Sequence, residues 1–539
     1  MTTAHPAFTF MVRAVVLVAL CGLGSCGGGG GGGGSSNSNN NGGGSGNGNG
    51  DWTPGTFLDA DRFAAQCAAP RSGIDPTTGQ RYPDVQGTAT DENNWLRSWS
   101  NDLYLWYNEI DDVNPAGYDT LDYFDLLKTF ATTPSGNPKD KFHFWYPTDD
   151  WVALSQSGIT AGYGALWVIL ADVPPRELVV AYTDPNSPAT APSAKLARGA
   201  EVLTVDGVDL VNANDQAGVD TLNRGLWPAQ VGEHHVFTVR DPDGTQRSIT
   251  MTSANVTSTP VQNVKTIADP MGPVGYMQFN DHIATAEQEL IDAIEQLRDD
   301  GVTDLVLDMR YNGGGYLDIA NELAYMIAGP GITDGRSFEE LRFNDKHPAT
   351  NPVTGAPLEP FPFHNEAQGF SAPFGDRLPT LNLSRVFVLT GPDTCSASES
   401  VMNGLLGVDV QVIQIGTRTC GKPYGFYPQD NCGTTYFTIE FQGVNAKGDG
   451  DYTDGFSPGE APPGGDVMAG CFVEDDFTHG LGDPSEARLN VALGYRGGLG
   501  CTALHQSEDR SMIASVSRLA AIDGHARKSP WLQNRTLRR

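Results

Sequence analysis

The chain has 539 residues, with 65 acidic against 34 basic side chains and a formal net charge of −31. Such an acidic chain is a poor partner for nucleic acid, because phosphates are bound by clustered lysine and arginine side chains. A hydrophobic content of 39% is sufficient for globular cores, and the length is sufficient for several domains.

Residues 1–25 have the pattern of an export signal. Arg13 precedes an apolar run, residues 14–23, that is too short to span a bilayer. The Leu-Gly-Ser-Cys sequence that ends at Cys26 resembles the lipobox of bacterial lipoproteins. The resemblance implies lipidation of Cys26 and, because glycine follows it, attachment to the outer membrane, facing the periplasm or the cell surface. An ordinary secretory signal with a chance cysteine is the alternative, and both interpretations export the chain.

Residues 26–50 are nearly all Gly, Ser and Asn, which predicts a flexible tether without a core. Six cysteines lie beyond the signal region, and an even number in an exported chain predicts disulfides. The sequence alone does not choose among the pairings. None of the six forms a CxxC pattern, so no metal site is predicted.

Residues 51–150 read as a small, largely helical domain. Leu96, Trp99, Leu103 and Trp106 fall on one helical face, which indicates core packing.

Residues 155–256 contain a strand at 178–182 and an Asp-Gly hairpin signal at 243–244. The loop before the first strand resembles the carboxylate-binding loop of a PDZ domain. Such a domain adds a peptide as an extra strand and holds its terminal carboxylate with backbone N–H groups. A scaffolding role alone is the alternative. The loop residues are Gly162, Tyr163, Gly164 and Ala165.

Strands at 274–279 and 305–309 alternate with helices around 290–297 and 317–327, which predicts a parallel α/β sheet. Three glycines, 313–315, follow the second strand, at the sheet edge where such folds bind ligands. Glycine permits a backbone conformation that points N–H groups at a substrate oxygen. A tight strand-to-helix turn is the alternative. Residues 330–384 are rich in Pro, Asn, Gly and Phe and predict an excursion with little regular structure.

The stretch 386–422 reads as strand, turn, helix, strand and turn. Ser396 falls where the strand at 386–389 turns into a helix, beside N–H groups able to hold an oxyanion. Lys422 follows the strand at 410–415 and can reach that hydroxyl from the neighbouring strand end. An unprotonated lysine there can activate the serine.

Three segments, TCSASE with Asn-Gly-Leu, GTRTCGK and DLVLDMRYNGGG, together resemble the C-terminal processing (tail-specific) peptidases over roughly residues 90–460. The resemblance implies a multidomain α/β (α+β) fold. Its ClpP/crotonase-like ββα core spans 257–500, with an inserted PDZ-like domain and an N-terminal helical domain, and 501–539 form a tail.

The same resemblance implies an exported serine endopeptidase with a Ser–Lys dyad that acts on proteins with unstructured C-termini, without cofactor or metal. Ser396 is the nucleophile, and Lys422 is the general base and later the acid. Backbone N–H groups of Ala397 and of Gly314 or Gly315 form the oxyanion hole. Lys422 must be neutral near pH 7, which requires burial among apolar groups such as the neighbouring strand and Tyr424.

Some features depart from the family pattern. Lys422 follows Ser396 by 26 residues, one more than the family interval implies. Asp409 is near, but not at, the place of an aspartate in some relatives, and Phe426 stands where others carry glutamine. A third catalytic residue is therefore open. The alternatives are a catalytically inactive peptide- or ligand-binding protein, a hydrolase of non-peptide esters, and a histidine triad, for which His282 is a candidate.

Two further patterns predict turns. Residues 455–459 match G-x-S-x-G, but Pro458 lacks the N–H that an oxyanion hole needs after the serine. Asp449, Asp451 and Asp454 are spaced unlike an EF-hand, so a solvated turn is predicted rather than a calcium site.

Overall fold

The computed structural model describes residues 52–75, 78–459, 466–501 and 535–536, and the statements below concern these residues. The predictions for the export signal, for Cys26 and for the tether lie outside them. No helix in the described part of the chain is both long enough and apolar enough to cross a membrane.

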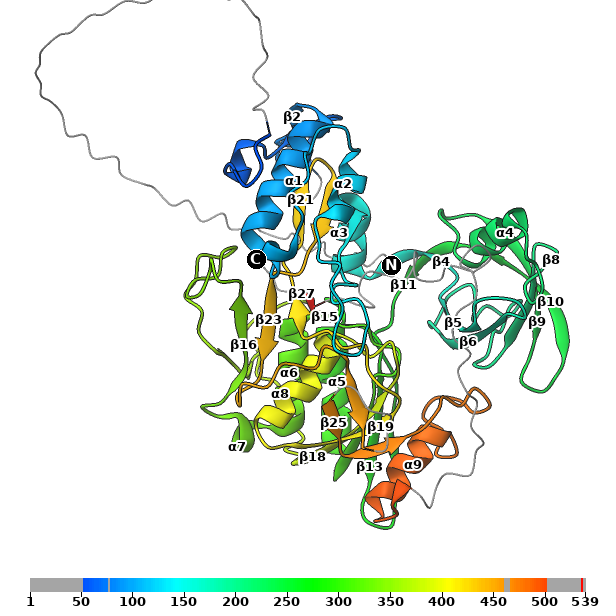
Figure 1. Ribbon diagram of the computed structural model, residues 1–539. Coiled ribbons are helices and arrows are strands. Elements are labelled where there is room, and N and C mark those ends of the chain that lie inside the picture. Colours follow the sequence, from blue (N-terminus) through cyan, green and yellow to red (C-terminus); the bar gives the residue numbers. More distant parts are fainter. Residues whose placement is uncertain (1–51, 76–77, 460–465, 502–534, 537–539) are drawn as a thin grey trace, which may run out of the picture. The chain divides into compact units, whose positions relative to one another are not determined.

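A six-stranded sheet of order β12-β13-β14-β18-β19-β26 is the framework of the predicted core (Figure 1). β12 pairs antiparallel with β13, and the other neighbouring pairs are parallel, as the strand–helix alternation predicts. The strands are β12 Val261–Ile267, β13 Val274–Phe279, β14 Asp304–Asp308, β18 Arg385–Thr390, β19 Gln411–Gly416 and β26 Gly470–Phe472.

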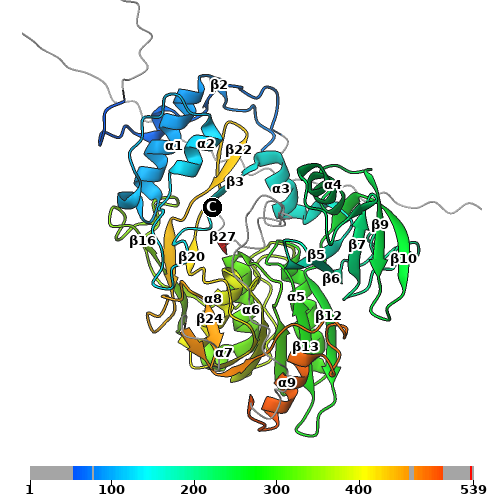
Figure 2. The ribbon, with the colours of Figure 1, turned by 45° about the vertical axis from the view of Figure 1, so that its right-hand side comes forward.

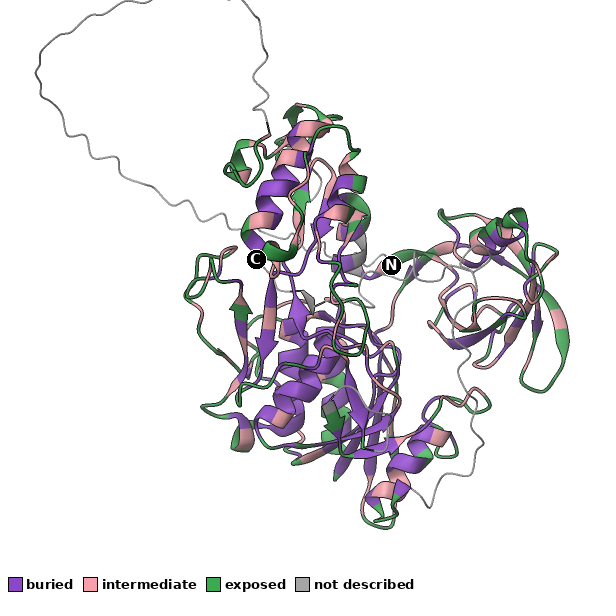
Figure 3. Ribbon diagram, viewed as in Figure 1, coloured by how far each residue is buried: buried purple, intermediate pink, exposed green. Residues whose placement is uncertain are grey.

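Both faces of this sheet are covered by helices. Val386 and Val388 of β18 pack in the same core as α5, α6 and α8, whereas Phe387 and Leu389 pack with α9 on the opposite face. Figure 3 shows the central strands β13, β14, β18 and β19 and the helices α6 and α8 as almost continuously buried. The helices are α5 Ala286–Asp299, α6 Leu317–Ala328, α8 Ala397–Gly407 and α9 Ala487–Arg496.

The excursion at 330–384 contains more regular structure than predicted. β16, Ser337–Phe343, pairs antiparallel with β23, Phe441–Val444, in a sheet of order β17-β16-β23-β20. Most of the excursion is irregular as predicted, but the prediction missed β16, because a composition rich in turn residues obscured a strand with β-forming phenylalanines. The other elements are α7 Pro330–Thr333, β17 Phe361–Pro362 and β20 Tyr424–Gly425.

Residues 52–150 are helical only in part. Helix α1, Ala89–Leu103, begins with a capping box between Thr88 and Asp91 and buries Leu96, Trp99 and Leu103 as predicted. Trp106 lies beyond the helix end, because Tyr104 is already extended. The remaining elements are η1 Ala60–Arg62, β1 Gln66–Cys67, β2 Val85–Gln86, η2 Tyr107–Glu109, α2 Thr120–Leu126, β3 Phe144–Pro147 and α3 Thr148–Ser157.

This N-terminal region shares a sheet with the core. β3 pairs with β22, Thr434–Phe437, which pairs with β21, Gln429–Asn431. Disulfide Cys67–Cys432 adds a covalent link between the same regions.

Residues 159–257 form an insertion whose ends lie side by side, since β4, Ile159–Gly162, pairs with β11, Ala254–Thr257. The predicted strand and hairpin are present in a sheet of order β10-β9-β7-β6-β5. Tyr163 of the predicted carboxylate loop donates a hydrogen bond to the Gly225 carbonyl (2.9 Å), so its ring faces α4. The other elements are β5 Ala165–Ala171, β6 Glu177–Thr183, β7 Glu201–Val205, β8 Val208–Asp209, α4 Gln216–Leu226, β9 His234–Arg240 and β10 Gln246–Thr252.

The G-x-S-x-G segment is not a turn, contrary to the prediction. Phe456–Pro458 form strand β24, which pairs with β25, Asp466–Met468, and Ser457 Oγ accepts a hydrogen bond from Arg418 Nε (2.8 Å). Of the three aspartates in the preceding loop, Asp454 accepts hydrogen bonds from Thr133, Ser135 and Asn137.

Candidate active site

Ser396 occupies a sharp turn between β18 and α8. Its φ of 60° and ψ of −117° are unusual for a residue with a side chain, and such conformations cost of order 1–3 kcal/mol. Asn312 stabilises this turn, because its carbonyl accepts hydrogen bonds from the Cys395 N–H (3.1 Å) and from Ser398 Oγ (2.9 Å). Ser396 Oγ is buried and makes no hydrogen bond to any described residue. The hydroxyl is therefore available for chemistry.

Lys422 lies in an apolar environment. It is fully buried, and its Nζ is 4.8 Å from the ring centre of Phe142 and 4.4 Å from that of Phe426. Burial lowers the pKa of Lys422 well below its ordinary value, against the opposing charges of Asp140 and Glu399. The lowered pKa favours the neutral amine, which is the form that a general base requires. Phenylalanine rings, with Tyr424 nearby, provide the predicted apolar surroundings.

Glu399 joins the serine and lysine segments through their backbones. Its Oε2 accepts hydrogen bonds from the Ser396 N–H (2.9 Å) and the Lys422 N–H (2.8 Å). Its Oε1 accepts from Thr419 Oγ1 (2.5 Å) and the Gly421 N–H (2.9 Å). One buried carboxylate therefore positions both candidate catalytic residues. Burial raises the pKa of Glu399, and these hydrogen bonds oppose the rise.

A disulfide connects the same two segments. Cys395 precedes Ser396, Cys420 lies two residues before Lys422, and the two cysteines are bonded. The pairing left open by the sequence is thereby resolved, together with Cys67–Cys432 and Cys471–Cys501. The serine and lysine turns are held together by one covalent bond and one shared carboxylate.

The glycine-rich turn after β14 is organised by Asn312. Its Oδ1 accepts hydrogen bonds from the Gly314 N–H (3.0 Å) and pairs with His282 Nδ1 (3.0 Å). Gly314 and Gly315 have φ of 102° and 136°, the region that favours glycine. Of the predicted oxyanion donors, Gly314 already has a partner. Ala397 is the first residue of α8, a position whose N–H has no acceptor within the helix.

Two alternative catalytic residues are disfavoured by their surroundings. Asp409 is exposed at the end of α8, where it forms ion pairs with Lys447 (2.7 Å) and Arg336 (3.5 Å). His282 is buried, and burial lowers its pKa to about 3. Among the described residues its ring nitrogen Nδ1 pairs with Asn312 and not with a carboxylate, so His282 lacks the acidic residue of a serine triad.

Sequence reasoning missed three contributors. Glu399 carried a signal, because Ser396-x-x-Glu399 matches a capping box. Asp140 and Phe142 carried none, because they reach Lys422 from a loop far earlier in the chain. Asp140 is itself fixed by Tyr104, whose hydroxyl donates to Asp140 Oδ2 (2.7 Å).

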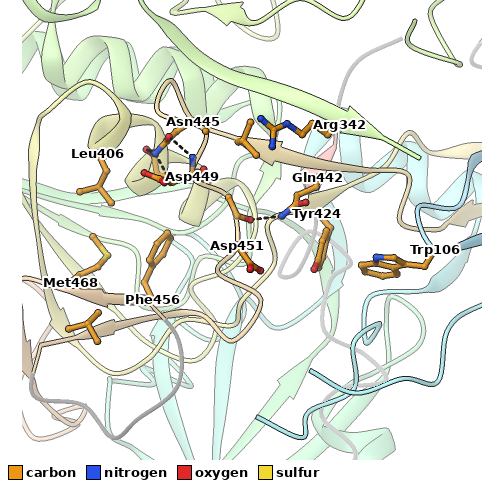
Figure 4. Close-up of a pocket in the computed structure, with 15 residues that line it drawn as sticks. Trp106, Arg342, Leu406, Tyr424, Gln442, Asn445, Asp449, Asp451, Phe456 and Met468 are labelled. Carbon is orange, nitrogen blue, oxygen red and sulfur yellow. Dashed lines mark hydrogen bonds between the residues drawn. The ribbon is translucent and has the colours of Figure 1, made fainter. Parts of the chain in front are cut away.

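A pocket of about 790 Å³ opens beside β20, the strand that follows Lys422 (Figure 4). Tyr424 and Gln442 lie next to each other on its wall, with Asp451 nearby and Trp106 beyond Tyr424. Trp106 packs edge-on against Tyr424, with ring centres 4.8 Å apart. Neither Ser396 nor Lys422 lines the pocket, so it adjoins the candidate site without containing it.

An α/β sheet that brings a strained serine turn, a buried lysine and a glycine turn to one edge has the organisation of a hydrolase core. Residues 273–427 match the model of peptidase family S41, and this segment contains Ser396, Lys422 and the glycine turn. The predicted resemblance to the C-terminal processing peptidases is thereby confirmed over this part of the chain.

Individual proteins are similar to parts of this chain. A carboxyl-terminal-processing protease from Picosynechococcus sp. is 26% identical over 270 residues, which are 50% of this chain and 56% of that protein. The match thus spans little more than half of the relative. The crystal structure of a Bacteroides fragilis protein described as an S41 protease has a TM-score of 0.56 at 22% identity, over 77% of this chain and 98% of that one. A photosystem II D1 C-terminal processing protease has a TM-score of 0.41 at 17% identity, over 69% and 92%.

Proposed function

We propose that the chain is an exported serine endopeptidase that cleaves unfolded proteins, or their C-terminal tails, with Ser396 as nucleophile and Lys422 as base. The observation that carries the proposal is the burial of Lys422 against Phe142 and Phe426, in a turn joined by Glu399 to that of Ser396. A lysine confined in this way loses its proton more readily than one in water.

The reaction begins when neutral Lys422 Nζ takes the proton from Ser396 Oγ, as Oγ bonds to the substrate carbonyl carbon. The tetrahedral oxyanion collapses, the C–N bond breaks, and Lys422 returns the proton to the departing amine. Water then attacks the acyl-serine ester with Lys422 again as base. Oγ recovers its proton and the new C-terminus leaves.

The oxyanion is held by the N–H groups of Ala397 and Gly315. Gly314 is the weaker candidate because its N–H donates to Asn312 Oδ1. A donor of this kind contributes about 3 kcal/mol to lowering the barrier.

In this proposal the PDZ-like insertion binds the substrate and delivers it to the site. β5 is an edge strand of its sheet and can accept an extended peptide as a further strand. Loop residues 162–165 would hold the peptide's C-terminal carboxylate. Lipidation of Cys26 and the tether at 26–50 would keep the enzyme at the outer membrane.

The test is cleavage of fluorescein-labelled casein and of a peptide with an apolar C-terminus by residues 51–539. We expect Ser396→Ala and Lys422→Ala each to lower kcat/KM by at least about 10³-fold, because nucleophile and base act as a unit. Ser400→Ala, a buried serine one turn along α8, and Lys447→Ala, an exposed lysine, are the matched controls and keep their activity.

Residual cleavage by Lys422→Ala near the wild-type rate would contradict the dyad. A folded wild-type protein that cleaves neither substrate, yet binds the peptide, would instead indicate a binding protein on a peptidase fold.

A further inference from the structure

A segment of the N-terminal region, residues 129–142, reaches the turn that carries Lys422. Lys141 Nζ donates a hydrogen bond to the Cys420 carbonyl (2.8 Å), and the ring centre of Phe142 is 4.8 Å from Lys422 Nζ. The segment leads into β3, which pairs with β22 of the core, and Figure 2 shows these two strands side by side. The end of this segment therefore passes directly beside the candidate base.

Asp140 is held in one orientation within the segment. It is buried, its Oδ2 accepts a hydrogen bond from the Tyr104 hydroxyl (2.7 Å), and its Oδ1 accepts one from the Phe142 N–H (2.9 Å). Both oxygens are acceptors, which is the role of an ionised carboxylate. Burial lowers the pKa of Lys422, and of the two negative charges that oppose this lowering Asp140 has the larger effect and Glu399 the smaller.

Other titratable groups near Lys422 are engaged elsewhere or carry no charge. Glu399 accepts four hydrogen bonds from the serine and lysine turns. Lys141 donates to a backbone carbonyl. Three neighbouring side chains are neutral at pH 7 because burial shifts their pKa values, upward for the phenols and downward, to about 4, for the imidazole: Tyr104, Tyr424 and His143. Asp140 is thus the carboxylate best placed to respond to a charge on Lys422.

We propose that Asp140 is a positioning residue for the candidate base, and that its carboxylate is the counter-ion of the ammonium formed when Lys422 takes the proton of Ser396 Oγ. The proton transfer rests on the proposed function, whereas the influence of Asp140 on the charge of Lys422 does not. The ammonium persists until its proton passes to the departing amine nitrogen, and it forms again during deacylation. A carboxylate fixed beside it in advance stabilises that charge without reorganisation.

The first experiment measures the titration of Lys422 in full-length protein that carries Ser396→Ala, so that no cleavage is needed. Lysine labelled with ¹³C at Cε gives an NMR signal that follows protonation, and the signal of Lys422 is the one absent from Lys422→Met. Asp140→Asn and, as a second neutral variant, Asp140→Thr remove a charge that favours the ammonium. We therefore expect Lys422 to lose its proton at lower pH in both variants.

Asp454→Asn is the matched control for this titration. Asp454 holds the same segment through three of its side chains, but it is not among the charges that act on Lys422. We expect the titration of Lys422 to stay where it is in this variant. Loosening of the segment alone is thereby separated from loss of the Asp140 charge.

The second experiment follows kcat/KM for casein against pH in the active enzyme. For Asp140→Asn we expect the rise that marks loss of the lysine proton to move to lower pH, and the plateau above it to fall roughly 10-fold or more. A merely structural role would lower the plateau and leave the position of the rise unchanged. Tyr104→Phe keeps the charge and removes one hydrogen bond, so the rise should not move to lower pH.

An unchanged titration of Lys422 in the neutral Asp140 variants overturns the proposal, whatever the activity. A titration moved to lower pH with an unchanged plateau of kcat/KM overturns the role of Asp140 as counter-ion in the reaction. A titration moved to lower pH in proteins that never cleave any substrate supports the influence of Asp140 on Lys422 and contradicts the proposed function instead.

Discussion

The serine–lysine turns and the insertion at 159–257 are fastened to the sheet in different ways. The turns are joined by a disulfide and by Glu399, whose two oxygens receive four hydrogen bonds, three of them from backbone N–H groups. The hydrogen bonds of Glu399 are buried, and three of the four act on the main chain. They leave Ser396 and Lys422 little freedom to separate.

Arg198 is one of the side chains that join the insertion to the core. Arg198 donates from Nη1 to the Tyr311 hydroxyl and from Nη2 to Asp475 Oδ1, both at 2.7 Å. The accompanying apolar contact is small, with Ala181, Tyr311 and Leu481 as its buried residues.

The comparison indicates that the geometry of the serine–lysine turns must be precise, whereas the insertion can move relative to the core. Acyl transfer tolerates little displacement between nucleophile and base, so their joint is made of backbone and covalent bonds. In the proposed function the insertion captures varied peptides, a task that tolerates movement, and the Arg198 side chain is part of its attachment to the core. The following changes test this division.

The largest effect is expected from Glu399→Gln. The amide NH₂ would face two of the four donors, so kcat/KM should fall at least about 100-fold and stability by about 2–4 kcal/mol. The measurements are casein cleavage and urea unfolding. Glu287→Gln is the control, since Glu287 is equally buried and accepts three backbone N–H groups far from Ser396. If both variants lose activity only in proportion to unfolding, Glu399 has no positioning role.

An intermediate effect is expected from Arg198→Ala. Loss of its charged hydrogen bonds loosens the insertion, at a cost of about 2 kcal/mol. We expect kcat/KM for casein to fall roughly tenfold, with hydrolysis of a short peptide ester unchanged because it does not require delivery. Arg240→Ala, which removes the exposed ion pair with Glu201 inside the insertion, should change neither rate. Equal loss on ester and protein would place the effect of Arg198 in the core instead.

The smallest of the expected effects is a change in stability. The pKa of Lys422 is lowered on folding, so the unfolded chain binds more protons than the folded one at neutral pH. Stability therefore rises as pH approaches the ordinary lysine pKa of about 10.4. Lys422→Met removes this penalty and should raise Tm by about 2–4 °C at pH 7, an advantage that shrinks at pH 10.

Lys447→Met is the matched control, because Lys447 is partly exposed and pairs with Asp409. It should leave Tm within about 1 °C of wild type. A lower Tm for Lys422→Met would mean that the amine is stabilised in place and carries no cost.

The elements around the site could be predicted because they are long and strongly patterned. β18 and β19 are β-branched runs, and α8 follows with apolar residues at helical spacing and an acid in its first turn. Ser396 and Lys422 followed from motifs in a fixed order. These are local patterns, which can be recognised in a single sequence without knowledge of the fold.

What the sequence concealed depends on tertiary packing. Asp140 and Phe142 reach Lys422 through a fold-dependent approach that no local pattern encodes. The composition of the surrounding segment obscured β16. Trp106 was predicted to lie on the same helix as Leu96, but α1 ends at Leu103, before it reaches Trp106. Asp409 was considered for its position in sequence, but the end of α8 turns it to solvent.

The Cys395–Cys420 disulfide also bears on when the candidate site can become active. Newly made chains around a ribosome are unfolded, which is the form of protein that a peptidase of this kind would digest. Thiols stay reduced in most cell interiors and oxidise outside them. With the proposed export, the disulfide between the serine and lysine turns would form only outside the compartment where proteins are made, so that the site would become fully joined after export.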